Sequence, residues 1–347
     1  MHNGFVRATL AGATALVLCV LVSPAAQVPA PVADPPPPFE AWLEGVVTEA
    51  RERGFAEALI AEALGGLEPL PQVIASDRNQ AEAAPRFDRY LNARLTRTAT
   101  ARGKELARTH RRLLSNIENA YGVQRRFLLA IWGLESGFGR NMGQTPVFRA
   151  LATLAWEPRR ATYFRRELFN ALTMVDRGYI EAKTMTGSWA GAMGQTQFMP
   201  SSYLNHAVDF DNDGRRDIWR STPDALASIA NYLKGAGWNI EQTWGREVRV
   251  SDALRATIAT SIPTREGGCS AIRSMTEPRP LQEWQDMGVR NRDGAPLPRA
   301  DMSAGLVDVG DRQFLVYSNY DSILSYNCAH FYALTVALLA DSLRPEA

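Results

Sequence analysis

Apolar residues recur at helical spacing over most of the chain. From 39 to 64 they return every three or four positions until Gly65-Gly66 interrupts them, and an arginine-rich pattern of the same kind covers 87–121. This period places the apolar residues on one buried face of a helix. The same spacing predicts further helices at 124–136, 147–156, 159–177, 222–235 and 327–343.

The pattern changes between Trp244 and Tyr317. Two short runs, 247–250 and 314–317, are separated by stretches that contain proline and glycine, which is typical of strands joined by turns. We therefore expect a mainly helical α+β protein with a small β-containing insertion near its C-terminal end.

Composition agrees with a folded protein of this kind. Of the 347 residues, 46% are hydrophobic and 22% are charged, which excludes collagen-like and wholly disordered chains. The 38 basic residues nearly balance the 37 acidic ones, and a net charge of +1 offers no case for nucleic-acid binding. We interpret the arginine-rich pattern as a solvated helix face.

The first residues are typical of a secretory leader. An unbroken apolar run at 8–22 follows a single arginine and predicts a signal peptide over 1–26, with an extended proline-rich arm at 27–38. Leu18 stands where a lipoprotein has a small residue before Cys19, so a soluble exported form is favoured over a lipid anchor. An uncleaved N-terminal anchor is the alternative.

Removal of the leader leaves two cysteines, Cys269 and Cys328. In an oxidising compartment they either pair or remain free thiols, and the sequence leaves both outcomes open. The cysteines and histidines do not cluster with the spacing of a zinc site or a catalytic Cys-His pair. The histidines are scattered, at His2, His110, His206 and His330.

The helix expected at 124–136 carries the most informative polar residue. Counting from Leu128, the buried face returns at Ile131 and then at Glu135, so a carboxylate lies on an apolar stripe. Burial disfavours ionisation, and such a group holds a proton near neutral pH and can pass it to a leaving group. A helix-ending glutamate that turns to solvent or caps a neighbour is the alternative, and the pattern alone does not choose between them.

A second segment, 187–203, combines small residues with amides, hydroxyls and aromatic rings. Small residues let the backbone approach a ligand closely, and the other groups hydrogen-bond to sugars and stack on them. This composition suits a carbohydrate cleft better than a tight glycine-rich turn.

Four separated motifs carry a family resemblance. They are Glu135-Ser136-Gly137-Phe138-Gly139-Arg140, then a Gly-Ala-Met-Gly segment with Gln197-Phe198-Met199-Pro200-Ser201-Ser202-Tyr203, then Ala230-Asn231-Tyr232-Leu233-Lys234 with Gly237-Trp238, and finally Tyr326-Asn327 with Tyr332. In this order they resemble the lytic murein transglycosylases of the membrane-bound B family, over about 39–343. Gln195, Thr196 and Cys328 depart from the family's pattern, which affects fine specificity and leaves the reaction intact.

The predicted signal peptide indicates a periplasmic location. The resemblance implies a lysozyme-like helical core that cleaves the bond between N-acetylmuramic acid and N-acetylglucosamine in peptidoglycan. It divides the chain into a helical N-terminal portion (39–122), the catalytic core (123–243), the β-containing insertion (244–317) and a C-terminal helix that completes the core (318–347). It makes Glu135 the acid/base and surrounds it with polar and aromatic groups, namely Ser188, Gln197, Tyr232, Tyr326, Asn327 and Tyr332.

The mechanism depends on the number of carboxylates. Ordinary glycosidases use two that flank the scissile bond. Only Glu135 is a convincing candidate, because Asp176 and Glu157 lie in stretches that we interpret as surface. We therefore favour a one-carboxylate reaction in which Glu135 protonates the glycosidic oxygen, the N-acetyl group assists, and the 6-hydroxyl closes a 1,6-anhydromuramyl end.

Other functions stay open at this point. A hydrolytic lysozyme-type muramidase is the nearest alternative, and a non-catalytic peptidoglycan-binding module is the alternative from another class. We expect a monomer that acts on peptidoglycan glycan strands and needs no cofactor for the chemistry. Contacts with cell-wall synthesis enzymes are left open.

The segment 209–220 matches an EF-hand calcium loop in part, with Gly214 at the sharp turn. Position 12 is Arg220, where a bidentate glutamate is usual, and resemblance to calcium-binding family members implies that Asp224 supplies the missing carboxylate. Any calcium would be structural, and a solvated acidic turn is the alternative. The other candidate ligands are Asp209, Asp211, Asp213, Arg215 and Asp217.

Overall fold

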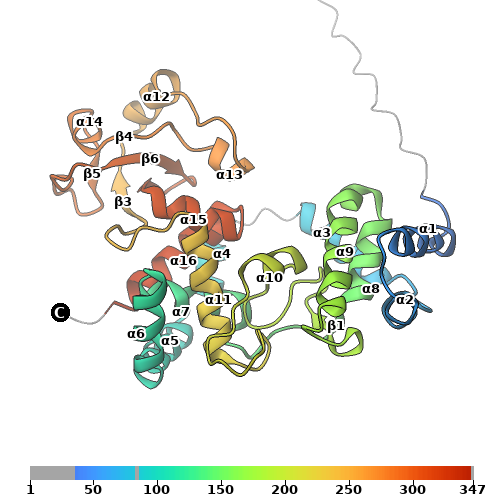
Figure 1. Cartoon of the computed structure of the whole chain (residues 1–347). Coiled ribbons are helices and arrows are strands. Elements are labelled where there is room, and N and C mark those ends of the chain that lie inside the picture. The colour runs from blue at the N-terminus through green and yellow to red at the C-terminus, as the bar shows by residue number, and fades with distance from the viewer. Residues whose placement is uncertain (1–35, 83–85, 345–347) are drawn as a thin grey trace, which may run out of the picture. The chain divides into compact units, whose positions relative to one another are not determined.

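The computed structural model describes residues 36–82 and 86–344 (Figure 1). The expected signal peptide at 1–26, and all but the last three residues of the expected arm at 27–38, lie outside the described residues. In the described part, helices predominate and one larger sheet forms near the C-terminal end. The expectation of a mainly helical α+β fold is confirmed.

The first helical pattern is divided into more helices than its periodicity predicts. The stretch 39–64 forms α1 (Phe39–Glu52) and α2 (Glu57–Leu64), because the chain turns at Gly54, whose φ is 85°. A third helix, α3 (Pro71–Glu82), lies where we expected none.

The arginine-rich pattern at 87–121 is likewise not one helix. Thr96 interrupts it by capping a new helix, since its side chain accepts a hydrogen bond from the N–H of Ala99 at 3.1 Å. The stretch therefore forms three helices, α4 (Phe87–Arg94), α5 (Arg97–Thr109) and α6 (Arg111–Tyr121).

The central helices follow the predicted spacing closely. Only α10 (Pro200–His206) was not expected, and it begins at a proline, which suits the first turn of a helix. Two-residue strands β1 (Thr145–Pro146) and β2 (Thr186–Gly187) pair beside these helices, and 3₁₀ turns form at Pro158–Arg160 and Ala182–Thr184. The expected helices are α7 (Arg125–Ser136), α8 (Val147–Trp156), α9 (Ala161–Asp176) and α11 (Thr222–Gly235).

The C-terminal pattern at 327–343 contains a shorter helix than expected, α16 (His330–Ser342), and a separate helix, α15 (Ser318–Tyr326), precedes it. The backbone is extended at Asn327, with φ −148° and ψ 115°, which ends the helical hydrogen bonding of α15. The two helices are bent by 117° at this break. Taken singly, no helix in the described ranges is long and apolar enough to cross a membrane.

The insertion forms a five-stranded antiparallel sheet in the order β4-β6-β7-β3-β5. The predicted strands at 247–250 and 314–317 correspond to β3 (Gly245–Arg249) and β7 (Gln313–Val316), which pair directly. The other elements are α12 (Asp252–Ser261), α13 (Ser270–Arg273), β4 (Arg279–Pro280), α14 (Leu281–Asp286), β5 (Arg290–Asn291) and β6 (Ser303–Asp308).

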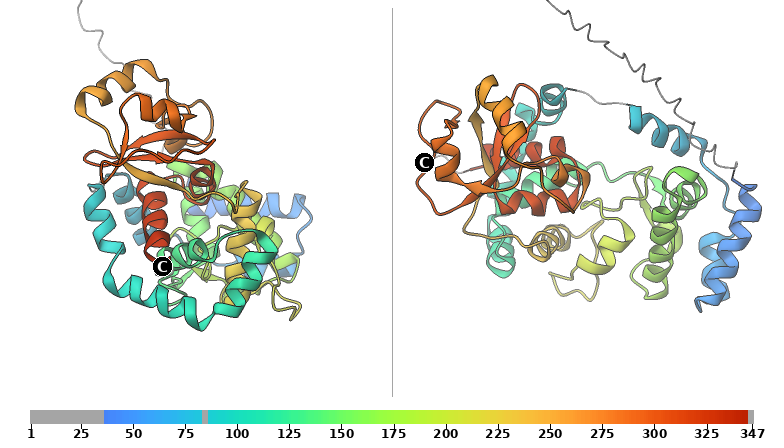
Figure 2. Two further views of the ribbon diagram at one scale, coloured as in Figure 1. Left: turned by 90° about the vertical axis from the view of Figure 1, so that its left-hand side faces the viewer. Right: turned by 90° about the horizontal axis from the view of Figure 1, so that it is seen from above.

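Three hydrophobic cores organise the described residues. The first joins α4, α5, α6 and α7 to α11, α15 and α16, and the second joins α1, α2 and α3 to α8, α9 and α10. The third lies between the sheet and helices α12 and α14, which Figure 2 shows beside the strands. Since α6 and α7 share the first core, that core extends across the division expected at residues 122 and 123.

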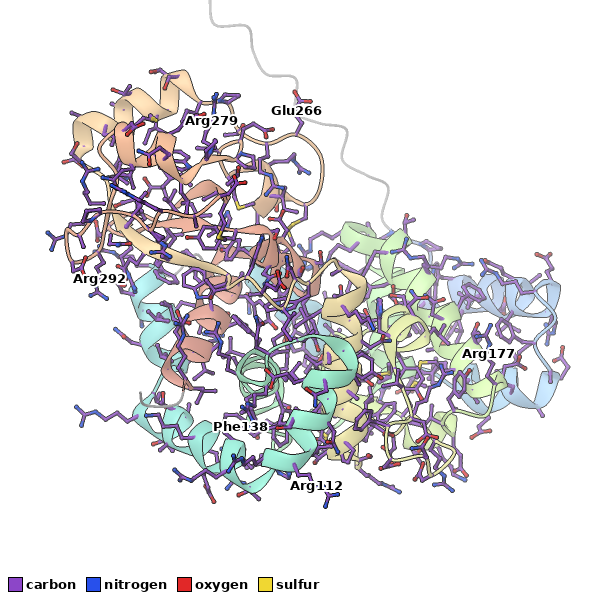
Figure 3. All side chains as sticks on the ribbon, turned by 60° about the vertical axis from the view of Figure 1, so that its left-hand side comes forward. Arg112, Phe138, Arg177, Glu266, Arg279 and Arg292 are labelled. Carbon is purple, nitrogen blue, oxygen red and sulfur yellow. A yellow bond between two sulfur atoms is a disulfide. The ribbon has the colours of Figure 1, made fainter. Side chains whose placement is uncertain are left out.

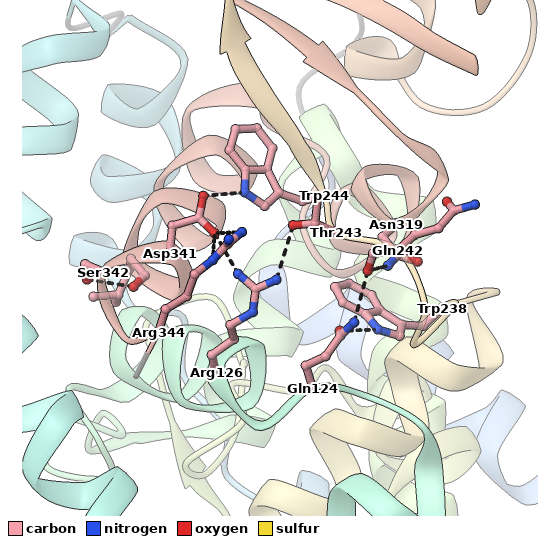
Figure 4. Close-up of polar contacts among 11 residues, drawn as sticks. Gln124, Arg126, Trp238, Gln242, Thr243, Trp244, Asn319, Asp341, Ser342 and Arg344 are labelled. Atoms are coloured by element: carbon pink, nitrogen blue, oxygen red, sulfur yellow. Dashed lines mark hydrogen bonds and ion pairs between the residues drawn. The ribbon is translucent and has the colours of Figure 1, made fainter. Parts of the chain in front are cut away.

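A hydrogen-bonded cluster and a disulfide join the insertion to the helical core. In Figure 4, Asp341 of α16 accepts hydrogen bonds from Arg126 of α7 at 2.6 Å and from the indole N–H of Trp244 at 2.9 Å. A disulfide between Cys269 and Cys328 ties α13 to the break between α15 and α16. The alternative of two free thiols is therefore wrong.

Candidate active site

The end of α7 is shaped to hold Glu135 in its last turn. The residues from Phe127 to Trp132 are buried, as the predicted apolar stripe requires. Gly133 makes room for Phe138 (labelled in Figure 3), because a Cβ at position 133 would lie 2.7 Å from the phenyl ring. Gly137, with a φ of 58°, ends the helix two residues after the acid.

The Glu135 carboxyl is half-buried and bonded to one side chain. The hydroxyl of Tyr332, on α16, donates a hydrogen bond to its Oε1 at 2.6 Å. Burial raises the pKa of Glu135 to about 7, and the hydrogen bond from Tyr332 lowers it only in part. Near neutral pH such a group exists both with and without its proton, so one carboxyl can donate a proton and later accept one.

Two more of the predicted tyrosines form a wall beside this acid. The rings of Tyr232 on α11 and Tyr326 on α15 lie 4.8 Å apart, and both contact Phe198. The Tyr326 hydroxyl donates to the carbonyl of Thr196 at 2.6 Å, and the Tyr232 hydroxyl donates to a carbonyl of α15 at 2.5 Å. Burial raises the pKa of both phenols, and the Glu135 charge raises that of Tyr326 further. Both rings are therefore held as neutral donors.

The other three predicted residues lie in loops. Ser188 is half-buried, and its Oγ accepts two backbone N–H groups of the turn that follows it. The Gln197 amide group donates to two backbone carbonyls, while its side-chain oxygen accepts no hydrogen bond within the described part of the chain. Asn327 is exposed, and its side chain bonds to no described residue. The structure thus brings Glu135 and the tyrosines into one group, with polar groups on the loops left able to bind a ligand.

Gln195 and Thr196, which depart from the family's pattern, are buried within the segment 187–203. The side-chain oxygen of Gln195 accepts the indole N–H of Trp132 at 3.0 Å, and its carbonyl accepts the Ser136 hydroxyl at 2.8 Å. These bonds fasten the segment to α7. Its composition led us to expect that the amides of this segment line a cleft. The structure differs, because Gln195 is used to hold the segment to α7.

Sequence reasoning missed Tyr90, a residue of α4. Burial raises the pKa of Tyr90, the neighbouring Arg94 cation lowers it, and the Glu135 carboxylate raises it again. Tyr90 also packs against Phe331 at the start of α16, with ring centroids 5.8 Å apart. Nothing in the arginine-rich pattern distinguishes this tyrosine, because its position beside the acid depends on the packing of α4 against α16.

The two carboxylates that we interpreted as surface residues differ from each other in the structure. Asp176 is exposed, as expected, but Glu157 is buried and pairs with Arg78 at 2.8 Å, so its assignment to the surface is wrong. Glu167 of α9 is also fully buried, and it accepts the N–H of Ser201 at the start of α10. Among the described residues, no second carboxylate contributes to the pKa of Glu135.

Backbone strain coincides with these segments. Over 36–82 and 86–344, the non-glycine residues with positive φ are Phe138 after α7, Gln197 in the segment 187–203 and Asn212 in the acidic loop, at 62°, 51° and 60°. Such conformations are costly and persist where surrounding contacts enforce them, often at functional sites.

The acidic loop gathers three exposed or half-buried carboxylates. Asp209, Asp211 and Asp213 each offer one oxygen, and these oxygens lie within 4.8 Å of one another. The N–H of Gly214 donates to Asp209 at 2.9 Å, which closes the turn. A converging set of hard oxygens of this kind fits calcium.

Two other predicted ligands serve the loop differently. Both oxygens of Asp224, a buried residue of α11, accept backbone N–H groups, from Phe210 and from Asp217, each at 2.8 Å. Asp217 in turn accepts two N–H groups of the following turn. Asp224 therefore braces both ends of the loop, and Arg215 is exposed on it.

An acid at the end of a buried helix, framed by tyrosines within a mainly helical fold, is the architecture of lysozyme-like proteins. The chain belongs to the family described as Transglycosylase SLT domain, whose model matches residues 38–341. The family resemblance read from the motifs is confirmed.

Individual relatives agree with this assignment. Membrane-bound lytic murein transglycosylase B of Escherichia coli (strain K12) is 34% identical over 231 residues, which cover 66% of this chain and 60% of the relative's length. The structure of SltB3 from Pseudomonas aeruginosa in complex with NAG-anhNAM-pentapeptide is 40% identical with a TM-score of 0.79, covering 88% of this chain and 79% of SltB3. Escherichia coli Slt35 in complex with calcium is 28% identical with a TM-score of 0.70, covering 87% and 92% of the two chains.

Proposed function

We propose that this protein is a lytic murein transglycosylase that cleaves the glycosidic bond between N-acetylmuramic acid and N-acetylglucosamine in peptidoglycan. The observation that carries the proposal is the Glu135 carboxyl, whose pKa burial raises to about 7 and whose Oε1 accepts the Tyr332 hydroxyl. Family membership supports the substrate class, as does the bound NAG-anhNAM-pentapeptide of SltB3.

In the first step, protonated Glu135 gives its proton to the glycosidic oxygen as the bond to the anomeric carbon of the muramyl residue breaks. The substrate's own N-acetyl group stabilises the positive charge that develops on that carbon from the opposite face. One carboxyl suffices because the substrate supplies the second nucleophilic group, whereas ordinary glycosidases use a second carboxylate.

In the second step, Glu135 acts as the base. Now ionised, it takes the proton from the 6-hydroxyl of the muramyl residue while that oxygen attacks the anomeric carbon. The product is a 1,6-anhydromuramyl end, formed without water, and Glu135 regains its proton. The hydrogen bond from Tyr332 stabilises the ionised state between the two steps.

The surrounding residues bind and orient the glycan. Tyr232 and Tyr326 offer ring faces to the sugars, and their hydroxyls are already held by backbone carbonyls, so the rings are fixed before the substrate arrives. Ser188, Gln197 and Asn327 supply polar groups that accept or donate hydrogen bonds to N-acetyl and hydroxyl groups.

The acidic loop is proposed to bind one structural calcium ion. Carboxylate oxygens of Asp209, Asp211 and Asp213, with the carbonyl of Arg215, are the ligands that this chain offers, and Asp224 holds the loop closed from behind. The calcium complex of the relative Slt35 supports this assignment. The ion would neutralise the mutual repulsion of the carboxylates and takes no part in bond cleavage.

The expected location is the periplasm, where the protein would act on glycan strands as a monomer. Partners among cell-wall synthesis enzymes would be found by crosslinking in intact cells, followed by mass spectrometry of the captured proteins.

The decisive experiment compares Glu135→Gln with a matched control, Glu241→Gln, in which the changed glutamate is exposed. Purified murein is digested, and soluble muropeptides are measured by mass spectrometry. Glu135→Gln should lower release at least about 10³-fold while the protein stays folded, and the control should act normally. Undiminished release would contradict the assignment of Glu135, and products with reducing ends alone would identify a hydrolytic muramidase.

A further inference from the structure

The net charge of the whole chain is close to zero, but one segment is strongly basic. Residues 86–126 contain eleven arginine and lysine residues and three acidic ones, an excess of eight positive charges. The preceding described segment, 36–82, has the opposite character, with three basic and nine acidic residues. Positive charge is therefore concentrated on α4, α5, α6 and the first turn of α7.

Each of the three acidic residues of this segment lies near an arginine. Asp88 lies 3.7 Å from Arg312, Glu105 pairs with Arg102 at 2.8 Å, and Glu118 lies 3.5 Å from Arg125. Six exposed arginines of the same segment form no ion pair with any described residue. We call them the basic surface, and they are Arg89, Arg94, Arg97, Arg108, Arg111 and Arg112.

Helix geometry turns several of these side chains outward. Arg97 and Arg108 stand three turns apart on one face of α5, opposite the buried Leu106. Arg112, in the first turn of α6, extends away from the ribbon in Figure 3. These guanidinium groups are therefore available to a partner outside the chain.

The basic surface begins beside the candidate active site. The guanidinium of Arg94 stacks over the Tyr90 ring, 3.7 Å from its centroid. Tyr90 lies close enough to Glu135 for that carboxylate to act on its phenol. Arg94 thus links the basic surface to Tyr90 of α4, the helix that packs against α16, which carries Tyr332.

We propose that the basic surface binds the carboxylates of the peptide stems that the muramyl residues of murein carry. This inference rests on the proposed function. The planar guanidinium fork matches a carboxylate with two parallel hydrogen bonds, and a row of stems along a glycan strand presents carboxylates repeatedly. The enzyme would then prefer stem-bearing strands to bare glycan.

A membrane surface is the less suitable partner. Binding in the plane of a bilayer combines basic residues with exposed tryptophan, phenylalanine or leucine that enter the acyl region. In the described part of the chain, the exposed large hydrophobic residues are Tyr163 and Ile240, and neither belongs to α4, α5 or α6. The basic surface thus fits a hydrated polycarboxylate better than a lipid layer.

The test uses the full-length mature protein and two matched triple variants. Arg97→Gln/Arg108→Gln/Arg112→Gln removes three charges from the basic surface, and the control removes three exposed, unpaired arginines elsewhere. Binding to intact murein sacculi and to phosphatidylglycerol vesicles is measured by cosedimentation. An amidase that removes the stems also removes the crosslinks and leaves one lactyl carboxylate on each muramyl residue, so binding to the resulting soluble stripped glycan is measured by fluorescence anisotropy. Circular dichroism confirms that each variant is folded. The control is Arg177→Gln/Arg249→Gln/Arg299→Gln.

The basic-surface variant should bind intact sacculi about tenfold more weakly at low ionic strength, and should bind stripped glycan as the wild type does. The control should change neither affinity. In the wild type, added salt should weaken binding to intact sacculi more than to stripped glycan, which tests the proposal without any substitution.

Equal losses on intact and stripped murein, no loss at all, or tighter wild-type binding to the vesicles than to sacculi would each overturn the proposal. These outcomes are separate from failure of the proposed function. If the wild-type protein releases no muropeptides, the proposed function is contradicted. If it releases them normally but binds murein equally well with and without stems, only the proposed role of the basic surface is contradicted.

Discussion

The half-buried Glu135 and the acidic loop at 209–217 place the same chemical group in two opposite environments. Glu135 stands alone among aromatic rings, with one phenol as its partner. Asp209, Asp211 and Asp213 lie at the surface with their oxygens within 4.8 Å of one another. The first environment favours a proton on the carboxyl, and the second favours a cation between the carboxylates.

This difference shows that the surroundings, rather than the residue type, separate a carboxyl suited to acid catalysis from carboxylates suited to ion binding. An isolated carboxyl in a low-dielectric site lowers its energy by keeping its proton. Clustered carboxylates in contact with water keep their charge and lower their energy by sharing a cation. The following experiments would break or sharpen this comparison.

The largest expected effect concerns the support of the loop. Asp224→Ala leaves the N–H groups of Phe210 and Asp217 without their acceptor, so we expect a loss of about 3 kcal/mol in the free energy of unfolding, measured by urea titration in the presence of a chelator. Asp301→Ala, at an exposed residue, is the control. Equal stability of the two variants would show that the loop needs no brace.

Calcium should stabilise the protein through the loop. At a calcium concentration about 100 times the dissociation constant, we expect a gain of about 2.7 kcal/mol and a higher Tm by calorimetry. Asp211→Asn/Asp213→Asn should abolish this gain, while Glu135→Gln should keep it. A melting curve that neither calcium nor chelator moves would count against the site.

Glu135→Gln should change stability with pH. Because the pKa of Glu135 is raised to about 7 in the folded protein, the folded state keeps a proton that the unfolded state loses above its ordinary pKa of 4.5. Wild-type stability therefore falls as pH rises from about 4.5 to about 7.

Glutamine carries no such proton, so above pH 8 Glu135→Gln should be more stable than the wild type by about 2 kcal/mol, with a smaller difference at pH 5. Asp213→Asn is the comparison from the loop, and we expect no similar trend in it when chelator is present. A pH-independent effect of Glu135→Gln would indicate that the carboxyl is not held neutral by burial.

The smallest effect is expected from Tyr332→Phe, which removes the hydrogen bond to Glu135. That bond lowers the pKa of Glu135, so its loss should raise the pKa further and move the alkaline limb of the activity profile to higher pH. The maximal rate should fall about tenfold, because the ionised intermediate loses a donor. A limb that moves toward lower pH would contradict the assigned role of Tyr332.

Local pattern was enough to single out Glu135 as the candidate acid and to predict the class of fold. The stripe Leu128, Ile131, Glu135 is a property of adjacent helical turns. Whether Glu135 turns to solvent was left open by this pattern, and the contact with Tyr332 of α16 decided it. The acidic loop is likewise local, since its ligands fall within a few residues of one another. Motif order then identified the family, which the match over 38–341 confirmed.

Helix boundaries were less predictable where a single residue decided them. Apolar periodicity continues through 39–64 and 87–121, so it did not reveal the turn at Gly54 or the cap at Thr96. These breaks depend on backbone conformation and on one side-chain hydrogen bond, and both are weak signals in a pattern of hydrophobicity.

The sequence by itself determined which residue is the candidate acid, which loop gathers carboxylates and that the chain is mainly helical. Only the tertiary structure decided that Cys269 and Cys328 pair and that the Glu135 charge acts on the Tyr90 phenol. It also decided that Asp224 accepts hydrogen bonds from both ends of the acidic loop. The physical reason is the range of the interactions. Periodicity and loop motifs act between neighbours in the chain, whereas pairing, burial and shifted pKa values arise between segments that meet only when the cores pack.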